Sequence, residues 1–334
     1  MSRSDSESAA DYLADIADES TGPLSRRERF DRFVEDSIRT PFRIIWGDLR
    51  TRIGISILLA FTLVGTVGVS IVPKPEFNEA PRYVPPFTNW AVPLGTDGYG
   101  KAIGKQLVHA TPAVLEIVVA GAVISMVLAT VIGVTAGYKG GRVDDILMFI
   151  TDAVLTIPGL PLILVIASIF TPERPFVVGL LLGIDNWPGL ARTLRSQVLS
   201  IRHESYVEAS RAMGMSSPHI LRKDVTKQLM PYITINAANA ARGVIFESVG
   251  LYFLGILPFT SANWGVIMNE AYQTSGVLSN LGRIHWMIWP MVTISLFSVG
   301  LILLSQGMDR LFNPRIRARH SDTAGEETAT AKME

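Results

Sequence analysis

Apolar residues along this chain gather in long blocks, and polar, proline-rich or charged stretches separate the blocks. A helix that crosses a hydrocarbon core of about 30 Å needs about 20 mostly apolar residues. The fourth block is short, and Asp185 and Asn186 interrupt it. The pattern predicts an all-α polytopic membrane protein with six transmembrane helices, at residues 53–72, 113–137, 146–170, 175–190, 229–257 and 286–304.

Basic residues predict the orientation of these helices, because cytoplasmic loops carry an excess of lysine and arginine. They concentrate before the first block, between the second and third, in the connection 191–228, and after the sixth. Both termini are therefore expected to be cytoplasmic, which agrees with an even number of crossings. The expected divisions are a partly disordered N-terminal arm (1–50), a transmembrane domain (51–312) and a C-terminal tail (313–334).

Composition removes several classes of function. The formal net charge is zero, so overall charge gives no reason to expect a nucleic-acid partner. The chain has no cysteine, which excludes disulfides and thiolate chemistry, and its five histidines lack the spacing of a metal site on one helix. We therefore expect no metal and no cofactor on this chain.

One stretch approaches a nucleotide-binding motif. Gly95–Ala102 nearly matches the phosphate-binding pattern G-x-x-x-x-G-K-[ST], but Ala102 stands where the magnesium-binding hydroxyl is needed. No buried strand precedes the stretch, and it lies on the outer side, so a glycine-rich turn is the better interpretation. The sequence does not support an intramembrane hydrolase either, because His285 lies only at a membrane edge and no G-x-S-x-G is present. We expect no enzyme activity.

A carboxylate lies inside the third predicted helix. Asp152 comes shortly before Ile157 and Pro158, where the proline predicts a kink. Because a charge at membrane depth is costly, such a side chain is expected to face a cavity or a partner.

The fifth predicted helix carries a polar stripe. Asn236, Asn239 and Arg242 recur every three residues on one helical face, and Glu247 follows within possible reach of Arg242. Two interpretations remain open. In the first, the stripe and Asp152 line a translocation pathway. In the second, the stripe forms an internal ion pair and hydrogen bonds that only hold the bundle together.

The connection 191–228 is too long for a tight link between antiparallel helices, and its composition favours helix. We expect two helices, at about 190–213 and 217–228, with Gly214 ending the first and Pro218 at the first position of the second. The end of the first helix presents Glu208 beside small residues, Ala209 and Ala212. Such a surface suits insertion into a groove of another protein.

These residues carry a resemblance to a known family. YVEASRAMG (Tyr206–Gly214) resembles the E-A-A-x-x-x-G signature of permease subunits of ATP-binding-cassette (ABC) importers. Further stretches resemble the dipeptide/oligopeptide/nickel-type permeases, in the order of the C-type subunit: Val92–Ile103, Gly137–Met148, Trp187–Arg202, Glu247–Gly255, Asn263–Gly265 and Gly307–Arg315. The resemblance therefore covers almost the whole chain.

The resemblance implies a type I ABC importer permease fold with a cytoplasmic coupling helix that docks on the ATPase. It implies a heterodimer with a second related permease, two ATPase subunits that hold ATP and magnesium, and an extracytoplasmic solute-binding protein. The coupling residues are then Glu208, Ala209, Ala212 and Gly214. The solute suggested is a di- or oligopeptide, although relatives also move nickel and oligosaccharides.

The sequence departs from the family pattern at several positions. Ser210 replaces the second alanine of the signature, and Thr226 and Lys227 stand where a Leu-Pro pair is frequent, with Pro231 the nearest proline. The second departure makes the exit from the connection uncertain, but it does not affect the docking end.

Two other functions remain as alternatives. An ion-driven secondary transporter would need ion ligands at the midplane, and only Asp152 and the stripe around Arg242 are available. A structural or receptor-like membrane protein would use the long connection as a scaffold. Transport without an ATPase would favour the first alternative, and a complex without an ATPase would favour the second.

Overall fold

The computed structural model describes residues 46–259, 262–277 and 280–312, and one compact unit begins at Leu49. The predicted N-terminal arm lies almost wholly outside the described residues, and the predicted tail lies wholly outside them. The described part is built from helices, with a single isolated antiparallel bridge between Thr96 and Ala102. The predicted all-α class is therefore confirmed for this part of the chain.

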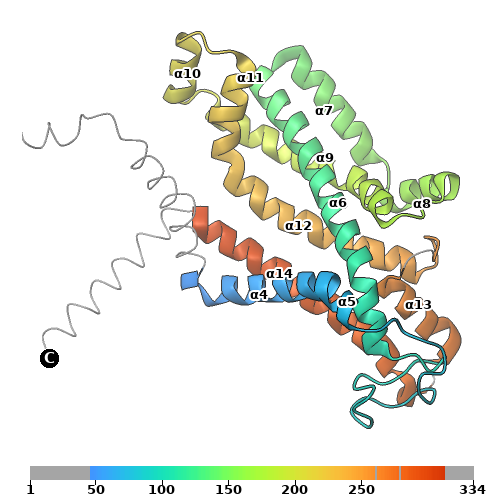
Figure 1. The fold of residues 1–334 in the computed structure, drawn as a ribbon. Helices are drawn as coiled ribbons and strands as arrows, with labels where there is room; N and C mark the ends of the chain where they lie inside the picture. Colours follow the sequence, from blue (N-terminus) through green and yellow to red (C-terminus); the bar gives the residue numbers. More distant parts are fainter. Residues whose placement is uncertain (1–45, 260–261, 278–279, 313–334) are drawn as a thin grey trace, which may run out of the picture. The chain divides into compact units, whose positions relative to one another are not determined.

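The helices follow one another along the chain as Figure 1 shows. The first long one comprises α4 (Leu49–Leu63), a π-helical turn (Val64–Gly68) and α5 (Val69–Ile71). Then come α6 (Ile103–Lys139), α7 (Gly141–Thr156), α8 (Gly159–Phe170), α9 (Pro175–Ile201) and the short α10 (Ser205–Ala212). The chain continues with α11 (Ser217–Ile220), a π-helical turn (Leu221–Val225), α12 (Thr226–Phe253), α13 (Trp264–Ser275), a 3₁₀ turn (Leu281–Arg283) and α14 (His285–Phe312).

Helix α6 is longer than the sequence pattern predicts. The second predicted helix starts at residue 113, whereas α6 begins at Ile103 and continues through Pro112. A proline removes one backbone donor from a helix interior, and here the surrounding turns keep the helix continuous despite that loss. The glycine-rich stretch before it forms the expected turn, with Gly95 and Gly100 at positive φ.

The third predicted helix is broken into two. Helices α7 and α8 meet at an angle of 85°. Ile157 adopts an extended conformation (φ −82°, ψ 122°), as steric contact with a following proline ring favours, and Pro158 lacks the amide N–H that would continue the helix. The predicted kink is thus confirmed at its expected place, whereas one straight helix is not.

Helix α9 passes through the polar residues that were expected to weaken it. It runs for 27 residues, to Ile201, and so continues past the predicted end of the span at residue 190. The polar pair is accommodated because Asn186 donates its side-chain N–H to the Leu182 carbonyl of its own helix (2.9 Å) and to Glu247 of α12 (3.0 Å).

By length and apolar composition, three of the described helices can cross a membrane: Leu49–Ile71, α6 and the segment His285–Met308 of α14. The bent pair of α7 and α8 adds a fourth if the two are one span. Helices α9 and α12 are long but more polar. The predicted number of six spans therefore stays a prediction.

Helices α6 and α9 pack closely because glycines line their contact. A Cβ atom at Gly133 would lie 2.3 Å from the Ala191 carbonyl oxygen, and one at Gly183 would lie 2.6 Å from that of Gly121. Ser125 adds a hydrogen bond from its hydroxyl to the Gly183 carbonyl (2.9 Å). Small residues allow backbones to approach in this way in membrane bundles. This pair makes the most extensive helix–helix contact in the described part of the chain.

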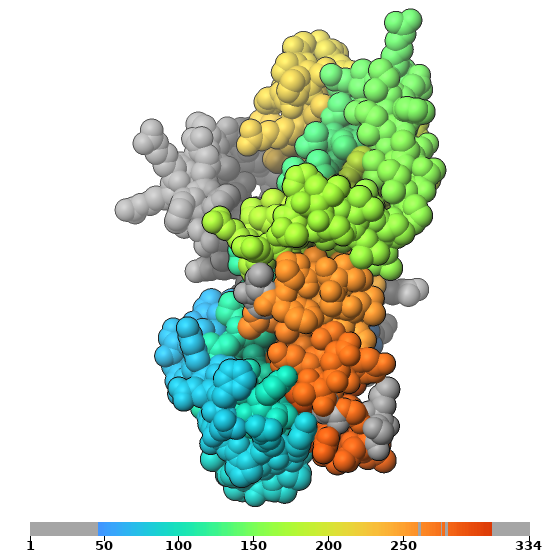
Figure 2. Space-filling view, turned by 90° about the vertical axis from the view of Figure 1, so that its right-hand side faces the viewer, coloured from blue at the N-terminus to red at the C-terminus, as the bar shows by residue number. Residues whose placement is uncertain are grey.

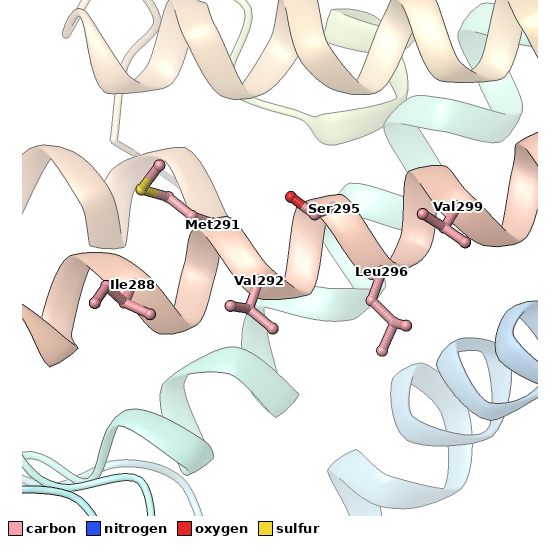
Figure 3. A pocket seen from close by; sticks show the side chains of 6 residues that line it. All are labelled: Ile288, Met291, Val292, Ser295, Leu296 and Val299. Atoms are coloured by element: carbon pink, nitrogen blue, oxygen red, sulfur yellow. The ribbon is translucent and has the colours of Figure 1, made fainter.

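Helix faces that point away from the bundle are strongly apolar. Four valines spaced four residues apart on α6 are more than half exposed: Val119, Val123, Val127 and Val131. On α14, a shallow groove of about 460 Å³ is lined by aliphatic side chains around Ser295 (Figure 3). Apolar faces of this kind suit a hydrocarbon environment and would be unfavourable in water.

Candidate coupling surface

Helix α10 ends in a glycine-based turn. Gly214 has φ +75°, in the left-handed region that glycine occupies without steric cost. The Met215 amide donates to the Ser210 carbonyl (3.1 Å) and the Gly214 amide to the Arg211 carbonyl (2.9 Å). This pair of bonds is the Schellman motif, which satisfies the last carbonyls of a helix. The predicted helix end at Gly214 is confirmed.

The helix that ends there begins later than we expected. Helix α9 stops at Ile201 and α10 starts at Ser205, so a single helix over 190–213 is wrong. The second predicted helix does start at Ser217, with Pro218 in its first turn, but it shows no serine side-chain cap. It continues through the π-helical turn into α12, so its predicted end at Gln228 is also wrong.

One face of α10 is fully open to solvent. Glu208, Ala209 and Ala212 are exposed, as is Gly214 beyond the helix end. Figure 2 shows this segment, in yellow, at the surface. Large apolar side chains that the sequence reasoning did not include flank the small residues: Tyr206 is 40% exposed and Met213 is 66% exposed. Exposed large apolar side chains that lie close together are typical of a protein-binding surface.

The opposite face of α10 is fixed to the bundle. Val207 is fully buried and packs in a cluster with Tyr138 of α6, Val198 of α9 and Ile220 of α11. The Ser210 hydroxyl donates to the Asp224 carboxylate of the π-helical turn (2.8 Å). These contacts tie α10 to the ends of α6 and α9, to α11 and to the π-helical turn that leads into α12.

Arg211 adds a further connection. Its guanidinium lies over the Tyr138 ring, 4.8 Å from the centroid, and its Nε donates to the Tyr138 hydroxyl (3.3 Å). A cation over an aromatic face is attracted by the ring quadrupole. Through Tyr138, α10 is therefore in direct contact with the end of α6.

A second link joins α9 to α7 close by. Arg195 donates from Nε and Nη2 to both carboxylate oxygens of Asp144, each bond being 2.5 Å long. Asp144 holds the pKa of Arg195 above its ordinary value, mainly through this side-chain hydrogen bond. Nearby, Arg202 donates to the Gly137 carbonyl (3.2 Å). The helix ends around α10 thus form one connected group.

Comparison with known families identifies the chain. The sequence profile of the family described as "Binding-protein-dependent transport system inner membrane component" matches residues 129–318, which include the whole of this surface. The chain belongs to this family.

Several characterised sequences are similar over most of their length. The dipeptide transport system permease protein DppC of Bacillus subtilis is 29% identical over 272 residues, covering 79% of this chain and 81% of that protein. The oligopeptide transport system permease protein OppC of the same organism is 27% identical over 226 residues, covering 67% and 72%. OppC of Lactococcus lactis subsp. lactis is 28% identical over 246 residues, covering 73% and 82%.

The structure explains how the chain accommodates Ser210, where it departs from the family signature. The signature carries a second alanine at this position, and a buried serine needs a hydrogen-bond partner. Asp224 supplies it. At the exit from the connection, Thr226 donates its hydroxyl to the Leu221 carbonyl (2.7 Å) inside the π-helical turn. The hydroxyl thus satisfies a carbonyl at the point where the backbone hydrogen-bond pattern changes.

The structure separates the polar residues that the sequence grouped together. Asn236 donates to the Tyr232 carbonyl of its own helix (2.8 Å), whereas Asn239 is exposed. Arg242 is partly buried and makes no side-chain hydrogen bond or ion pair within the described ranges. Glu247 accepts its bond from Asn186, so the ion pair with Arg242 that one of the two interpretations required is not formed.

Asp152 is bound elsewhere. It forms an ion pair with Arg192 of α9, and both side chains are more than half exposed. It is therefore not part of the stripe on α12.

Two residues of the bundle interior were missed as site candidates. Asp185 lies directly against the first turn of α8, where a Cβ at Gly159 would come within 2.0 Å of its carboxylate. Asn186, its neighbour, lies between α9 and α12, and a Cβ at Gly243 would be 3.3 Å from its Oδ1. The sequence showed this polar pair, but only as an interruption of an apolar block.

The family stretches around Asn263 have structural roles on the opposite side. Asn263 caps α13 by accepting from the Gly265 amide (2.8 Å), and the Trp264 indole donates to the Leu107 carbonyl of α6 (3.4 Å). A Cβ at Gly265 would lie 2.4 Å from the Val249 carbonyl, so glycine allows α13 to approach α12. No group of histidine and acidic side chains within the described ranges could hold a metal ion.

Proposed function

We propose that this chain is a permease subunit of an ATP-driven importer and that it moves di- or oligopeptides across the cell membrane. Membership of the binding-protein-dependent transport family supports the permease role. The similarity to dipeptide and oligopeptide permease proteins over most of their length supports the solute class. The chain itself breaks no bond: ATP and magnesium bind to partner ATPase subunits.

The proposed topology has six spans, namely α4 with α5, α6, α7 with α8, α9, α12 and α14. Helices α9 and α12 have 27 and 28 residues. At 1.5 Å per residue each is about 40 Å long, which is enough to cross a hydrocarbon core of about 30 Å. The distribution of basic residues supports a cytoplasmic location for both termini and for α10.

The partners in this proposal are a second related permease, two ATPase subunits, an extracytoplasmic solute-binding protein and membrane lipid. Helix α10 is the coupling helix, and it docks in a cleft of an ATPase. Ala209 and Ala212 allow close approach, Glu208 supplies a hydrogen bond or ion pair, and Gly214 permits the turn. Tyr206 and Met213 add apolar contact, because both are exposed beside the small residues.

The observation that carries this proposal is that α10 is open on one face and anchored on the other. Val207, Ser210 and Arg211 fix it to α6 and to the start of α12. A displacement imposed on the open face is therefore passed to both helices, because packed side chains transmit strain with little compression. When ATP closes the ATPase dimer, the spans tilt and the pathway changes the side to which it opens.

Asn239 and Arg242 are the best candidates for the translocation pathway. Glu247 and Asp152 have partners that hold helices together, Asn186 and Arg192 respectively. Asn236 is satisfied within its own helix. A partly buried arginine without a protein partner would be costly against lipid, so Arg242 is assigned to a cavity or to the second permease.

Uptake by the complete complex tests the proposed function. The complex would be reconstituted in liposomes with its solute-binding protein, and uptake of a labelled dipeptide would be followed with and without ATP. We expect uptake that requires both ATP and the binding protein. Uptake that persists without the ATPase would contradict the proposal, and ATP-driven uptake of nickel or an oligosaccharide in place of peptides would contradict the solute class.

A further inference from the structure

A small pocket lined by polar and apolar side chains lies between the start of α6, α13 and the segment that precedes α6. Its volume is about 150 Å³. Polar side chains from three parts of the chain line it: Lys101, Gln106 and His109 near the start of α6, and Asn263 and Glu270 from α13 and its cap. We call it the α6–α13 pocket. None of the residues assigned to coupling or to the pathway belongs to it.

Asn263, which lines this pocket, has an unused donor. The residue is fully buried, and its Oδ1 already accepts the Gly265 amide that caps α13. Its Nδ2 has no hydrogen-bond partner among the described residues. A buried amide N–H without a partner is unfavourable, so such a group is expected to have one when the site is occupied. The missing partner is an acceptor.

Two opposite charges line the same pocket without forming an ion pair. The Lys101 ammonium lies over the Phe77 ring, 4.0 Å from its centroid, and no ion pair between Lys101 and Glu270 is formed within the described ranges. Burial raises the pKa of Glu270, whereas the Lys101 charge lowers it and the Asp97 charge raises it further. A buried carboxylate is stabilised by a cation in direct contact, and Glu270 forms no such ion pair among the described residues.

The neighbouring polar groups already have hydrogen-bond partners within the chain. The buried Asp97 carboxylate accepts from the amides of Tyr99 and Lys101 (2.8 Å each) and from the Gln106 side chain (2.9 Å). His109 is bonded to the Val72 carbonyl (2.9 Å). Lys101 and the Asn263 N–H remain as donors for a ligand, and Glu270 remains as the charged acceptor.

We propose that the α6–α13 pocket binds a small zwitterion whose ammonium and carboxylate are separated by a few bonds. The ammonium meets Glu270, and the carboxylate meets Lys101 and the Asn263 N–H. A free amino acid and a dipeptide share this chemistry, and a pocket of about 150 Å³ suits molecules of that size. Binding here is a property of this chain alone and does not require that peptides be the transported solute.

Calorimetric titration of the purified complex, without the solute-binding protein, tests the proposal. The probes are glycine and glycylglycine, and the controls are N-acetylglycine and glycinamide, each of which lacks one of the two charges. We expect saturable binding of at least one zwitterion and binding at least tenfold weaker for both controls. Equal binding of the controls, or no binding of either zwitterion, would overturn the proposal. Tighter binding of glycine would identify the ligand as a free amino acid, and tighter binding of glycylglycine would identify it as a dipeptide.

Two variants separate the ligand contacts from the fold. Asn263→Asp keeps the acceptor that caps α13 but replaces the donor by a carboxylate, and Glu270→Gln removes the negative charge. Both are expected to weaken zwitterion binding at least tenfold. Glu76→Gln, at an exposed position of the segment before α6 that does not line the pocket, is the matched control and should bind as the parent does. Unchanged binding in both pocket variants would contradict the assignment, whatever the outcome of the uptake experiment.

Discussion

The Ser210 hydroxyl lies 2.8 Å from the Asp224 carboxylate and joins α10 to the π-helical turn that leads into α12. Fourteen residues separate the two positions along the chain. The bond crosses the turn at Gly214, so it closes a small structural loop at the part of the subunit where we propose that force enters. Its strength should therefore affect both stability and coupling.

Replacing Ser210 by alanine tests this bond. The substitution leaves Asp224 without its donor, and a hydrogen bond to a charged group contributes about 1.5–3 kcal/mol. Asp224 is partly exposed, so water can replace part of the lost hydrogen bond. We therefore expect the free energy of unfolding to fall by an amount at the lower end of this range. Thermal unfolding of the complex would measure it. A double-mutant cycle with Asp224→Ala should show coupling between the two sites, and strictly additive effects would contradict the bond.

Gly214→Val should damage coupling more than stability. A Cβ at Gly214 meets no atom within 4 Å, so the cost is backbone strain at φ +75°, about 1–2 kcal/mol for a non-glycine residue. We expect an inserted complex that hydrolyses ATP with little uptake. The measurement is the ratio of peptide uptake to ATP hydrolysis in liposomes. Gly214→Asn is the control, because asparagine tolerates this region. Normal uptake by the valine variant would refute the role given to this turn.

Arg195→Lys should loosen the contact between α9 and α7. Lysine cannot reproduce the two parallel bonds that Arg195 makes to Asp144, although it keeps the charge. We expect a loss of about 1–2 kcal/mol of stability, given that the pair is partly exposed. Thermal unfolding checks this, with Arg192→Lys at the more exposed ion pair as the comparison. An equal loss in the two variants would show that the bidentate geometry is unimportant.

Stability should fall as the pH rises through the pKa of Glu270. Burial raises this pKa above its ordinary value of 4.5, so the folded state binds more protons than the unfolded state in that window. Stability is then fully present below 4.5 and is lost as the pH passes the raised pKa. Glu270→Gln should reduce this slope. The groups around Glu270 are Lys101, Asp97 and His109, so the histidine variant His109→Gln serves as the control. If the Glu270→Gln variant kept the same dependence of stability on pH, the burial of the Glu270 carboxyl would be contradicted.

The sequence predicts well the features that local chemistry decides. Gly214 ends a helix because only glycine readily takes its conformation, and Pro158 breaks the third predicted helix because proline lacks an amide N–H. The exposed positions of Glu208, Ala209 and Ala212 follow from the same reasoning, because these residues lie on one side of a short helix.

Tertiary contacts decide the features that the sequence did not reveal. No glycine or proline marks the break between α9 and α10, and the Arg202 side chain instead bonds to the Gly137 carbonyl of α6. Glu247 pairs with Asn186, which lies 61 residues away, and not with Arg242 on its own helix. Such pairings depend on which helices become neighbours, and periodicity along one helix carries no information about that.

Crosslinking from α10 tests the central claim most directly. The chain has no cysteine, so Ala209→Cys and Ala212→Cys each introduce a unique thiol on the exposed face of α10. Ala120→Cys, which places the thiol at a buried position of α6, is the matched control. With a short bifunctional reagent and the assembled complex in inside-out vesicles, we predict crosslinks from positions 209 and 212 to an ATP-hydrolysing subunit, with a yield that changes on ATP binding. If neither position reached such a subunit, or if both thiols reacted only from the extracytoplasmic side, the assignment of α10 as the coupling helix would be wrong.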